Sequence, residues 1–198
     1  MEQSKSIKTA NTDYEIIDLI AERWSPRAFA DTPVEQEKLN QLFEAARWAP
    51  SSSNEQPWRY IYAHKGTKGY DKLFEALVSG NQEWAKSAPV LGVSIAKMQF
   101  DYKNRNNRHA YHDTGMATGM LLIQATQLGL YVHQMGGFSQ DKMRELFDIP
   151  EGYEPIAAMA IGYLGDADTL SDKNKESELK PRERKPISEM SFNGEFKK

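Results

Sequence analysis

The segment that most constrains the fold is residues 155–165, a run that is almost continuously apolar. A second run, residues 90–96, has the same character. Runs without a polar alternate position are typical of strands at the centre of a sheet whose two faces are both covered. The two runs therefore predict a central sheet with helices packed on each face.

Two further strands and one helix follow from local composition. Residues 58–63 are rich in aromatic and β-branched side chains, and residues 131–134 form a shorter predicted strand. Ser139 is expected to cap a helix that carries Met143 on its apolar face.

Start signals and apolar periodicity predict four more helices. The first is expected to begin after Asp13 as its N-cap, and the second after Thr32, which forms a capping box with Glu35. Apolar residues at helical spacing predict a third helix over residues 70–77 and a longer one over residues 109–128. Helices and strands thus alternate through most of the chain.

The composition changes after the last predicted strand. Residues 166–198 are polar and charged with little periodicity, so this stretch does not form a packed unit by itself. We expect a single domain over residues 1–198, since no linker interrupts residues 14–165. The stretch 166–198 is predicted to be an extended C-terminal arm that lies against its own domain or a partner subunit.

Composition excludes several classes of function. The net charge is −3 and the pI is near 5.9, so there is no broad basic surface for a nucleic-acid backbone. The chain has no cysteine, which excludes disulfides, thiolate nucleophiles and iron–sulfur clusters, so redox chemistry would need a bound cofactor. No run is apolar enough for a signal peptide or a membrane span. We expect a cytoplasmic protein with neither nucleic-acid nor membrane partners.

Arginines near both ends of the chain are candidates for an anion site. Arg23, Ser25 and Arg27 lie near the N-terminus, and Arg182 and Arg184 lie near the C-terminus. Guanidinium groups bind phosphate through two parallel hydrogen bonds, and arginines this far apart in sequence can meet around one shared anion. In the simpler interpretation, the first set marks a helix end and the second is a solvated basic tract.

Two loop segments are the other candidates. Residues 50–58 read Pro-Ser-Ser-Ser-Asn-Glu-Gln-Pro-Trp, in which Asn54 offers both a donor and an acceptor. The pair Gly136 and Gly137 follows a predicted strand. In the simpler interpretation, the first segment is an ordinary polar loop, and the glycines form a turn that requires positive φ.

Together these segments resemble the nitroreductase family of FMN-dependent oxidoreductases. Its members share an Arg-x-Ser-x-Arg segment, a Pro-Ser-x-x-Asn-x-Gln-Pro-Trp segment and a basic Lys/Arg-x-Arg-x-Pro segment, and the resemblance covers about residues 14–190. It implies the α+β nitroreductase fold, with a mixed central sheet flanked by helices. It also implies an intertwined homodimer with FMN at the subunit interface.

The resemblance assigns roles to particular residues. Arg23 and Ser25 are expected to contact the FMN phosphate, over which Arg184 closes. Arg27 is expected near N1 and O2 of the flavin, and Asn54 at its pyrimidine edge. The predicted cofactor-binding residues are Arg23, Trp24, Ser25, Arg27, Ser52, Ser53, Asn54, Gln56, Gly136, Gly137, Arg182 and Arg184.

The resemblance also implies the chemistry. The glycine turn is expected to lie against the flavin ring near N5, which accepts a hydride from transiently bound NAD(P)H. A ping-pong cycle then passes electrons to a nitroaromatic, quinone or enone-type acceptor. No catalytic side chain is predicted, because the cofactor carries the reaction.

Some functional questions stay open at this point. A reductive dehalogenase or a flavin-cleaving synthase on the same fold, and a flavin carrier or sensor without turnover, are the alternatives. Phe100, Tyr102 and Tyr111 are candidates for a substrate lid, with core packing or a dimer contact as the alternative. His109 and His112 lack the spacing of zinc-binding helix motifs, so no metal site is predicted.

Overall fold

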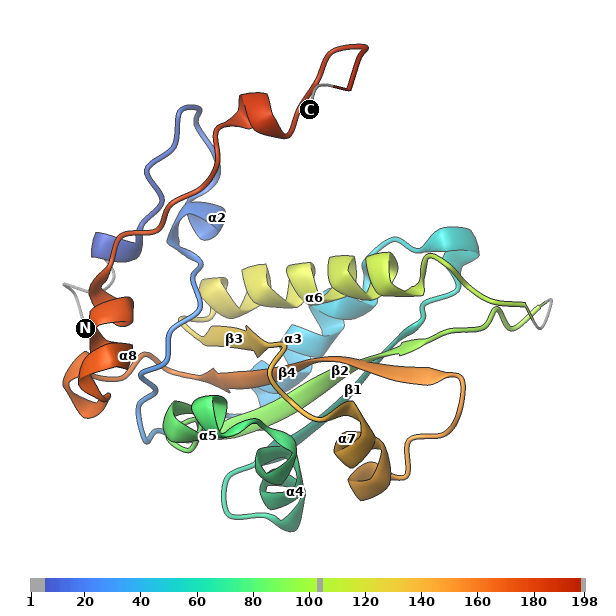
Figure 1. Cartoon of the computed structure of the whole chain (residues 1–198), viewed down its shortest axis with the longest axis horizontal. Helices are drawn as coiled ribbons and strands as arrows, with labels where there is room; N and C mark the ends of the chain where they lie inside the picture. The colour runs from blue at the N-terminus through green and yellow to red at the C-terminus, as the bar shows by residue number, and fades with distance from the viewer. Residues whose placement is uncertain (1–5, 103–104, 197–198) are drawn as a thin grey trace.

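A computed structural model describes residues 6–102 and 105–196, and a four-stranded sheet forms its centre (Figure 1). The strands are β1 (Trp58–His64), β2 (Val90–Lys97), β3 (Tyr131–Met135) and β4 (Tyr153–Gly162). Their order is β1-β2-β4-β3. The two apolar runs are therefore the central strands, as predicted.

The strand directions differ from the prediction. All neighbouring pairs of the four described strands are antiparallel, so the predicted mixed sheet is wrong for this part of the chain. An apolar run indicates that both faces are covered, whereas strand direction depends on the path between strands. Between β1 and β2 that path contains two helices, α4 (Lys68–Ala76) and α5 (Ser79–Ala85).

Helices cover both faces of the sheet (Figure 1). One face carries α3 (Gln36–Arg47) and α6 (Ala110–Gln127), and the other carries α4, α5 and α7 (Gln140–Phe147). Alternate residues of β4 enter the two cores, with Met159 on the α6 side and Ala160 on the α4 side. This two-sided burial explains why residues 155–162 of β4 include no polar side chain.

The first predicted helix start is wrong. Helix α2 (Asp18–Glu22) begins five residues after the expected N-cap, Asp13. The expected apolar stripe of Ile16, Ile17 and Ile20 is 39%, 60% and 46% exposed. These isoleucines find no surface to bury against among the described residues, and packing supplies most of a helix's stability.

The capping box predicted for the second helix is also wrong. Helix α3 begins at Gln36, with Glu35 in the N-cap position and no side-chain cap, so Thr32 does not start the helix. The Glu35 carboxylate instead accepts a hydrogen bond from the Tyr163 hydroxyl at 2.6 Å and pairs with Lys38 Nζ at 3.3 Å. These tertiary contacts take up the group that a capping box requires.

The remaining helix predictions are confirmed. Helices α4 and α6 match their predicted ranges to within two residues. Ser139 Oγ accepts a hydrogen bond from the Lys142 backbone N–H at 3.2 Å and so caps α7. Local patterns missed α5 and also α8 (Asp172–Leu179), which lies in the C-terminal arm.

The C-terminal arm runs beside the N-terminal segment of the same chain (Figure 1). Helix α8 contacts the chain just before Phe29, and residues 182–187 face residues 10–23 across a cavity. Both segments extend away from the sheet on the side of α6 (Figure 1). Among the described residues, no helix combines the length and the apolarity needed to cross a membrane.

Candidate functional site

Residues 23–27, the N-terminal arginine segment, are anchored near the end of β4 by the residues that follow them. Phe29 forms an isolated antiparallel bridge with Leu164, and the Gly165 N–H donates to the Ala28 carbonyl at 2.9 Å. A Cβ on Gly165 would lie 2.5 Å from the carbonyl carbon of Phe29. Only glycine permits this approach, which fixes where residues 23–27 leave the sheet.

A buried carboxylate of the arm holds the backbone of this segment. Glu178 of α8 is 1% exposed. Its oxygens accept hydrogen bonds from the N–H of Arg27 at 3.0 and 3.1 Å and from the N–H of Ala28 at 3.1 Å. Burial raises the pKa of Glu178, an effect that these donors and the charges of Arg27 and Lys8 oppose. Sequence analysis missed Glu178, because one acidic residue in a polar arm carries no periodic signal.

Two more side chains bind carbonyl groups of the same segment. His133 on β3 donates through Nδ1 to the Pro26 carbonyl at 2.8 Å, and the Arg182 guanidinium donates to the carbonyls of Ala21 and Arg23. Burial lowers the pKa of His133 to about 4, so its ring is neutral at pH 7. The shape of the segment is therefore set by β3 and the arm.

Three predicted arginines meet at one cavity. Arg23, Arg182 and Arg184 line a space of about 490 Å³, together with Lys185 and one carboxylate, Asp13. Burial lowers the pKa of Arg23, and the nearby charge of Arg184 lowers it further. The pKa of Arg182 is also lowered, first by burial and then by the charges of Arg23 and Arg184. Within the described part of the chain, the Arg23 side chain has no hydrogen bond or ion pair. The cavity is therefore net cationic and favours a bound anion.

The other predicted residues of this segment have different surroundings. Arg27 does not line the cavity, and its Nη1 donates to Ser177 Oγ of α8 at 3.2 Å. The Trp24 ring is buried, with its centroid 6.0 Å from that of Tyr131. Trp24 is thus part of the packed interior, whereas Ser25 is exposed.

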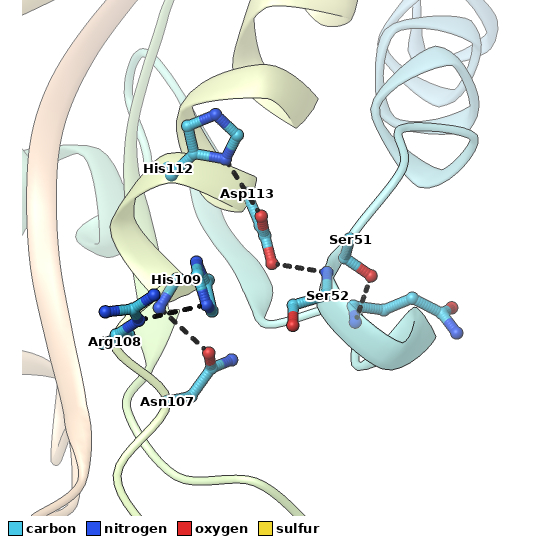
Figure 2. A network of polar contacts seen from close by, with 8 residues as sticks. Ser51, Ser52, Asn107, Arg108, His109, His112 and Asp113 are labelled. Atoms are coloured by element: carbon cyan, nitrogen blue, oxygen red, sulfur yellow. Dashed lines mark hydrogen bonds and ion pairs between the residues drawn. The ribbon is translucent and has the colours of Figure 1, made fainter.

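The predicted Ser/Asn segment forms a strained turn near the start of α6 (Figure 2). Ser53, Asn54 and Gln56 have φ values of 54°, 55° and 51°, a left-handed region that is uncommon for residues with a side chain. Ser51 Oγ accepts from the Gln56 N–H at 3.0 Å, and Gln56 Nε2 donates to the Asn54 carbonyl at 2.9 Å. Ser53 and Asn54 are exposed, so their side chains are accessible to a ligand.

Asp113, in the first turn of α6, holds this strained turn against the helix (Figure 2). Its Oδ2 accepts from the Ser52 N–H at 2.9 Å, and its Oδ1 lies 3.1 Å from His112 Nδ1. His109 occupies the N-cap position of the helix without a side-chain cap, and its N–H donates to Asn107 Oδ1 at 3.1 Å. Residues 6–102 and 105–196 contain no group of three His, Cys, Asp or Glu residues able to hold a metal ion.

The simpler interpretation of the turn at Gly136 and Gly137, that it requires positive φ, is wrong. Neither Gly136 nor Gly137 has positive φ, so the turn does not require glycine for that reason. A Cβ on Gly137 would lie 2.7 Å from Asn81 Nδ2 and 2.9 Å from Val78 Cγ2, whereas a Cβ on Gly136 would face open space. Gly137 thus allows close packing against the start of α5, and the Gly136 backbone stays accessible.

The predicted aromatic lid residues divide into two groups. Phe100 is buried and packs against Tyr102 with ring centroids 5.5 Å apart. Tyr111 is exposed, and its hydroxyl donates to Glu154. Core packing accounts for Phe100, and a lid role for the exposed Tyr102 and Tyr111 stays a prediction.

The two main groups of predicted site residues lie at opposite ends of α6. Asp113 binds the strained turn at the first helical turn, whereas Trp24 contacts Tyr131, which follows the C-terminal end of the helix. With 18 residues, α6 is about 27 Å long. One copy of the chain therefore does not bring Asn54 to the arginine cavity.

Most of the predicted site residues lie in the part of the chain that is similar to known proteins. Residues 20–83 and 71–163 match the sequence model of the Nitroreductase family. A solved structure described as an oxidoreductase containing FMN is similar, with a TM-score of 0.91 and 39% identity, covering 94% of this chain and 96% of that one. The family match includes the N-terminal arginines, the strained turn and the glycine turn, and it ends before Arg182 and Arg184.

Two further proteins are similar to this chain. A Streptomyces coelicolor protein, provisionally named a NADH dehydrogenase/NAD(P)H nitroreductase, is 40% identical over 155 residues, which is 69% of this chain and 76% of the relative. The structure of a nitroreductase family protein from Clostridium difficile 630 has a TM-score of 0.71 and 26% identity, covering 92% of this chain and all of that one.

Proposed function

Because this chain belongs to the nitroreductase family, we propose that it is an FMN-dependent oxidoreductase that uses NAD(P)H as its reductant. The observation that carries this proposal is the convergence of Arg23, Arg182 and Arg184 on one net-cationic cavity. A phosphate ester near neutral pH is close to a dianion, and guanidinium groups match its oxygens with paired donors. The cavity thus has the charge and the donors that the phosphate of FMN requires.

The remaining predicted residues fit the other parts of the cofactor. The exposed side-chain amide of Asn54 offers a donor and an acceptor suited to the pyrimidine edge of the flavin. The open side of Gly136 leaves room for a planar ring. When bound, FMN supplies two-electron chemistry at N5, between NAD(P)H and a nitroaromatic, quinone or enone-type acceptor in a ping-pong cycle.

We infer that the working unit is a homodimer. The arginine cavity and the strained turn lie at opposite ends of α6, so a second copy is needed to bring them to one cofactor. An exposed face of α6 supports this arrangement, since Met116, Gly119, Met120 and Ile123 line an open apolar groove with Pro50. Apolar faces of this kind are typical of surfaces that another chain covers.

The proposal is tested on the purified protein after reconstitution with FMN. NADH or NADPH should bleach the yellow flavin under anaerobic conditions, and a quinone, nitroarene or enone should restore the colour. Replacing Arg184 with glutamine should weaken FMN binding on the order of tenfold or more, because a charge-assisted pair of hydrogen bonds is lost. Arg144→Gln, on the opposite face of the sheet, is the matched control and should bind FMN as the wild type does.

Two results would contradict this proposal. Wild-type protein that binds no FMN would exclude the cofactor. Bound flavin that bleaches with dithionite but not with either nicotinamide would instead support a carrier or sensor.

A further inference from the structure

The Asp113 side chain ties the strained turn at residues 51–56 to α6. Asp113 is 2% exposed, and its Oδ2 accepts the Ser52 N–H at 2.9 Å across 61 residues of sequence. Figure 2 shows its second oxygen facing His112, whose Nδ1 lies 3.1 Å away. The turn therefore has a buried, charged acceptor at the point where it approaches the helix.

The backbone of the turn makes such a tie necessary. Ser53, Asn54 and Gln56 are non-glycine residues with left-handed φ values, and such residues persist only where the surroundings hold them. The bonds from Gln56 to Ser51 and to Asn54 lie within the turn and define its local shape. The bond to Asp113 instead sets the position of the turn relative to α6.

We propose that Asp113 is a positioning residue, which holds the turn so that Ser52 and Asn54 meet the pyrimidine edge of the cofactor. This inference rests on the proposed FMN-dependent function. Asp113 does not line the arginine cavity, and it acts only through the turn. Because that cavity lies toward the other end of α6, Asp113 of one protomer orders the site whose phosphate is bound by the other protomer.

Single substitutions test the positioning role through FMN affinity, measured by quenching of flavin fluorescence. Asp113→Ala leaves the Ser52 N–H without its acceptor, so the Kd for FMN should rise on the order of 10- to 100-fold. Asp113→Asn keeps an amide oxygen that can accept the same bond, so its Kd should rise less. Asp141→Asn removes an exposed carboxylate from the first turn of α7 and is the matched control, with an unchanged Kd.

A second substitution separates positioning from a general loss of stability. Glycine adopts positive φ without strain, so Ser53→Gly should recover part of the FMN affinity lost in Asp113→Ala. The same change in the wild type should give no gain. A role of Asp113 limited to stabilising α6 would show no such coupling between the two positions.

Mixed dimers test the action across protomers. When Arg184→Gln and Asp113→Ala chains are combined, a shared site places both defects in one pocket and leaves the other pocket intact. The mixed dimer should then bind about one FMN per two chains with wild-type affinity, whereas each parent homodimer binds weakly. The absence of any wild-type pocket in the mixed dimer would overturn the proposed action across protomers.

The failures of the two proposals are distinguishable. Wild-type FMN affinity in Asp113→Ala, with weak binding in Arg184→Gln, would overturn the role of Asp113 and leave the proposed function standing. If Asp113→Ala does not fold, Asp113→Asn and its coupling to Ser53→Gly decide the matter in the same way. Wild-type protein that binds no FMN would overturn the proposed function itself.

Discussion

Replacing His133 with asparagine should remove an acid-sensitive part of the protein's stability. The ring of His133 donates to the Pro26 carbonyl and lies 4.5 Å from the Trp84 ring, measured between centroids. Burial lowers its pKa from the ordinary 6.5 to about 4. The unfolded chain therefore binds a proton more readily than the folded chain does.

The sign and size of the effect follow from proton linkage. Because the folded pKa is the lower one, the contribution to stability is complete above about pH 6.5 and is lost as the pH falls toward 4. Between pH 7.5 and pH 5, these two pKa values correspond to a loss of about 2 kcal/mol in the free energy of unfolding. Glu178 acts in the opposite direction, since burial raises its pKa, so the difference between wild type and variant is the informative quantity.

The assay is urea unfolding of the apoprotein, followed by circular dichroism at a series of pH values and at one protein concentration. Asparagine cannot titrate, yet its side-chain N–H can still donate to the Pro26 carbonyl. His133→Asn should therefore lose about 2 kcal/mol less than the wild type between pH 7.5 and pH 5. His133→Phe keeps a ring against Trp84 without the donor, so it should be less stable than His133→Asn at every pH and should likewise lack the acid-sensitive loss.

Two outcomes would refute the reasoning. Equal losses of stability in wild type and His133→Asn over this pH range would show that His133 is not held neutral by the fold. A large dependence of the difference on salt would show that charge, and not burial, sets the pKa of His133, because screening acts mainly on exposed charges.

Further predictions concern the glycine turn and the α6 face. Gly137→Ala should lower the free energy of unfolding by about 1–3 kcal/mol in urea titrations, because its Cβ would press on Asn81 and Val78. Gly136→Ala faces open space, so it should leave stability within about 0.5 kcal/mol and slow reduction of bound flavin by NAD(P)H, as stopped-flow absorbance would show. Equal loss of stability in both variants would contradict this distinction. Met120→Lys, on the exposed apolar face of α6, should yield a monomer in size-exclusion chromatography with light scattering and weaken FMN binding. A Met120→Lys dimer that binds FMN normally would exclude this face as the interface.

The sequence predicted the layers of the fold because burial on two faces leaves a local record. Residues 155–165 and 90–96 became β4 and β2, the central strands of the sheet. Helix α6 and the Ser139 cap of α7 were likewise recognisable, since periodicity and capping depend on residues close together in the chain. Strand direction left no such record, and the predicted mixed sheet was wrong for the described strands.

The sequence also singled out the arginines, the turn at residues 51–56 and the glycine pair, but it did not reveal what holds them. Asp113, His133 and Glu178 bind backbone groups that are 61, 107 and about 150 residues away in sequence. No local pattern distinguishes these three residues from other polar residues of their elements. Only the packed structure brings each one to its backbone partner.

The sequence by itself determined which segments carry donors for an anion and for a flavin edge, because donor chemistry belongs to the residue type. Tertiary structure decided how those segments are grouped: Arg23, Arg182 and Arg184 share one cavity, while Asn54 lies toward the other end of α6. The physical reason is the length of that helix, which at 18 residues spans about 27 Å and holds the two groups toward its opposite ends within one chain.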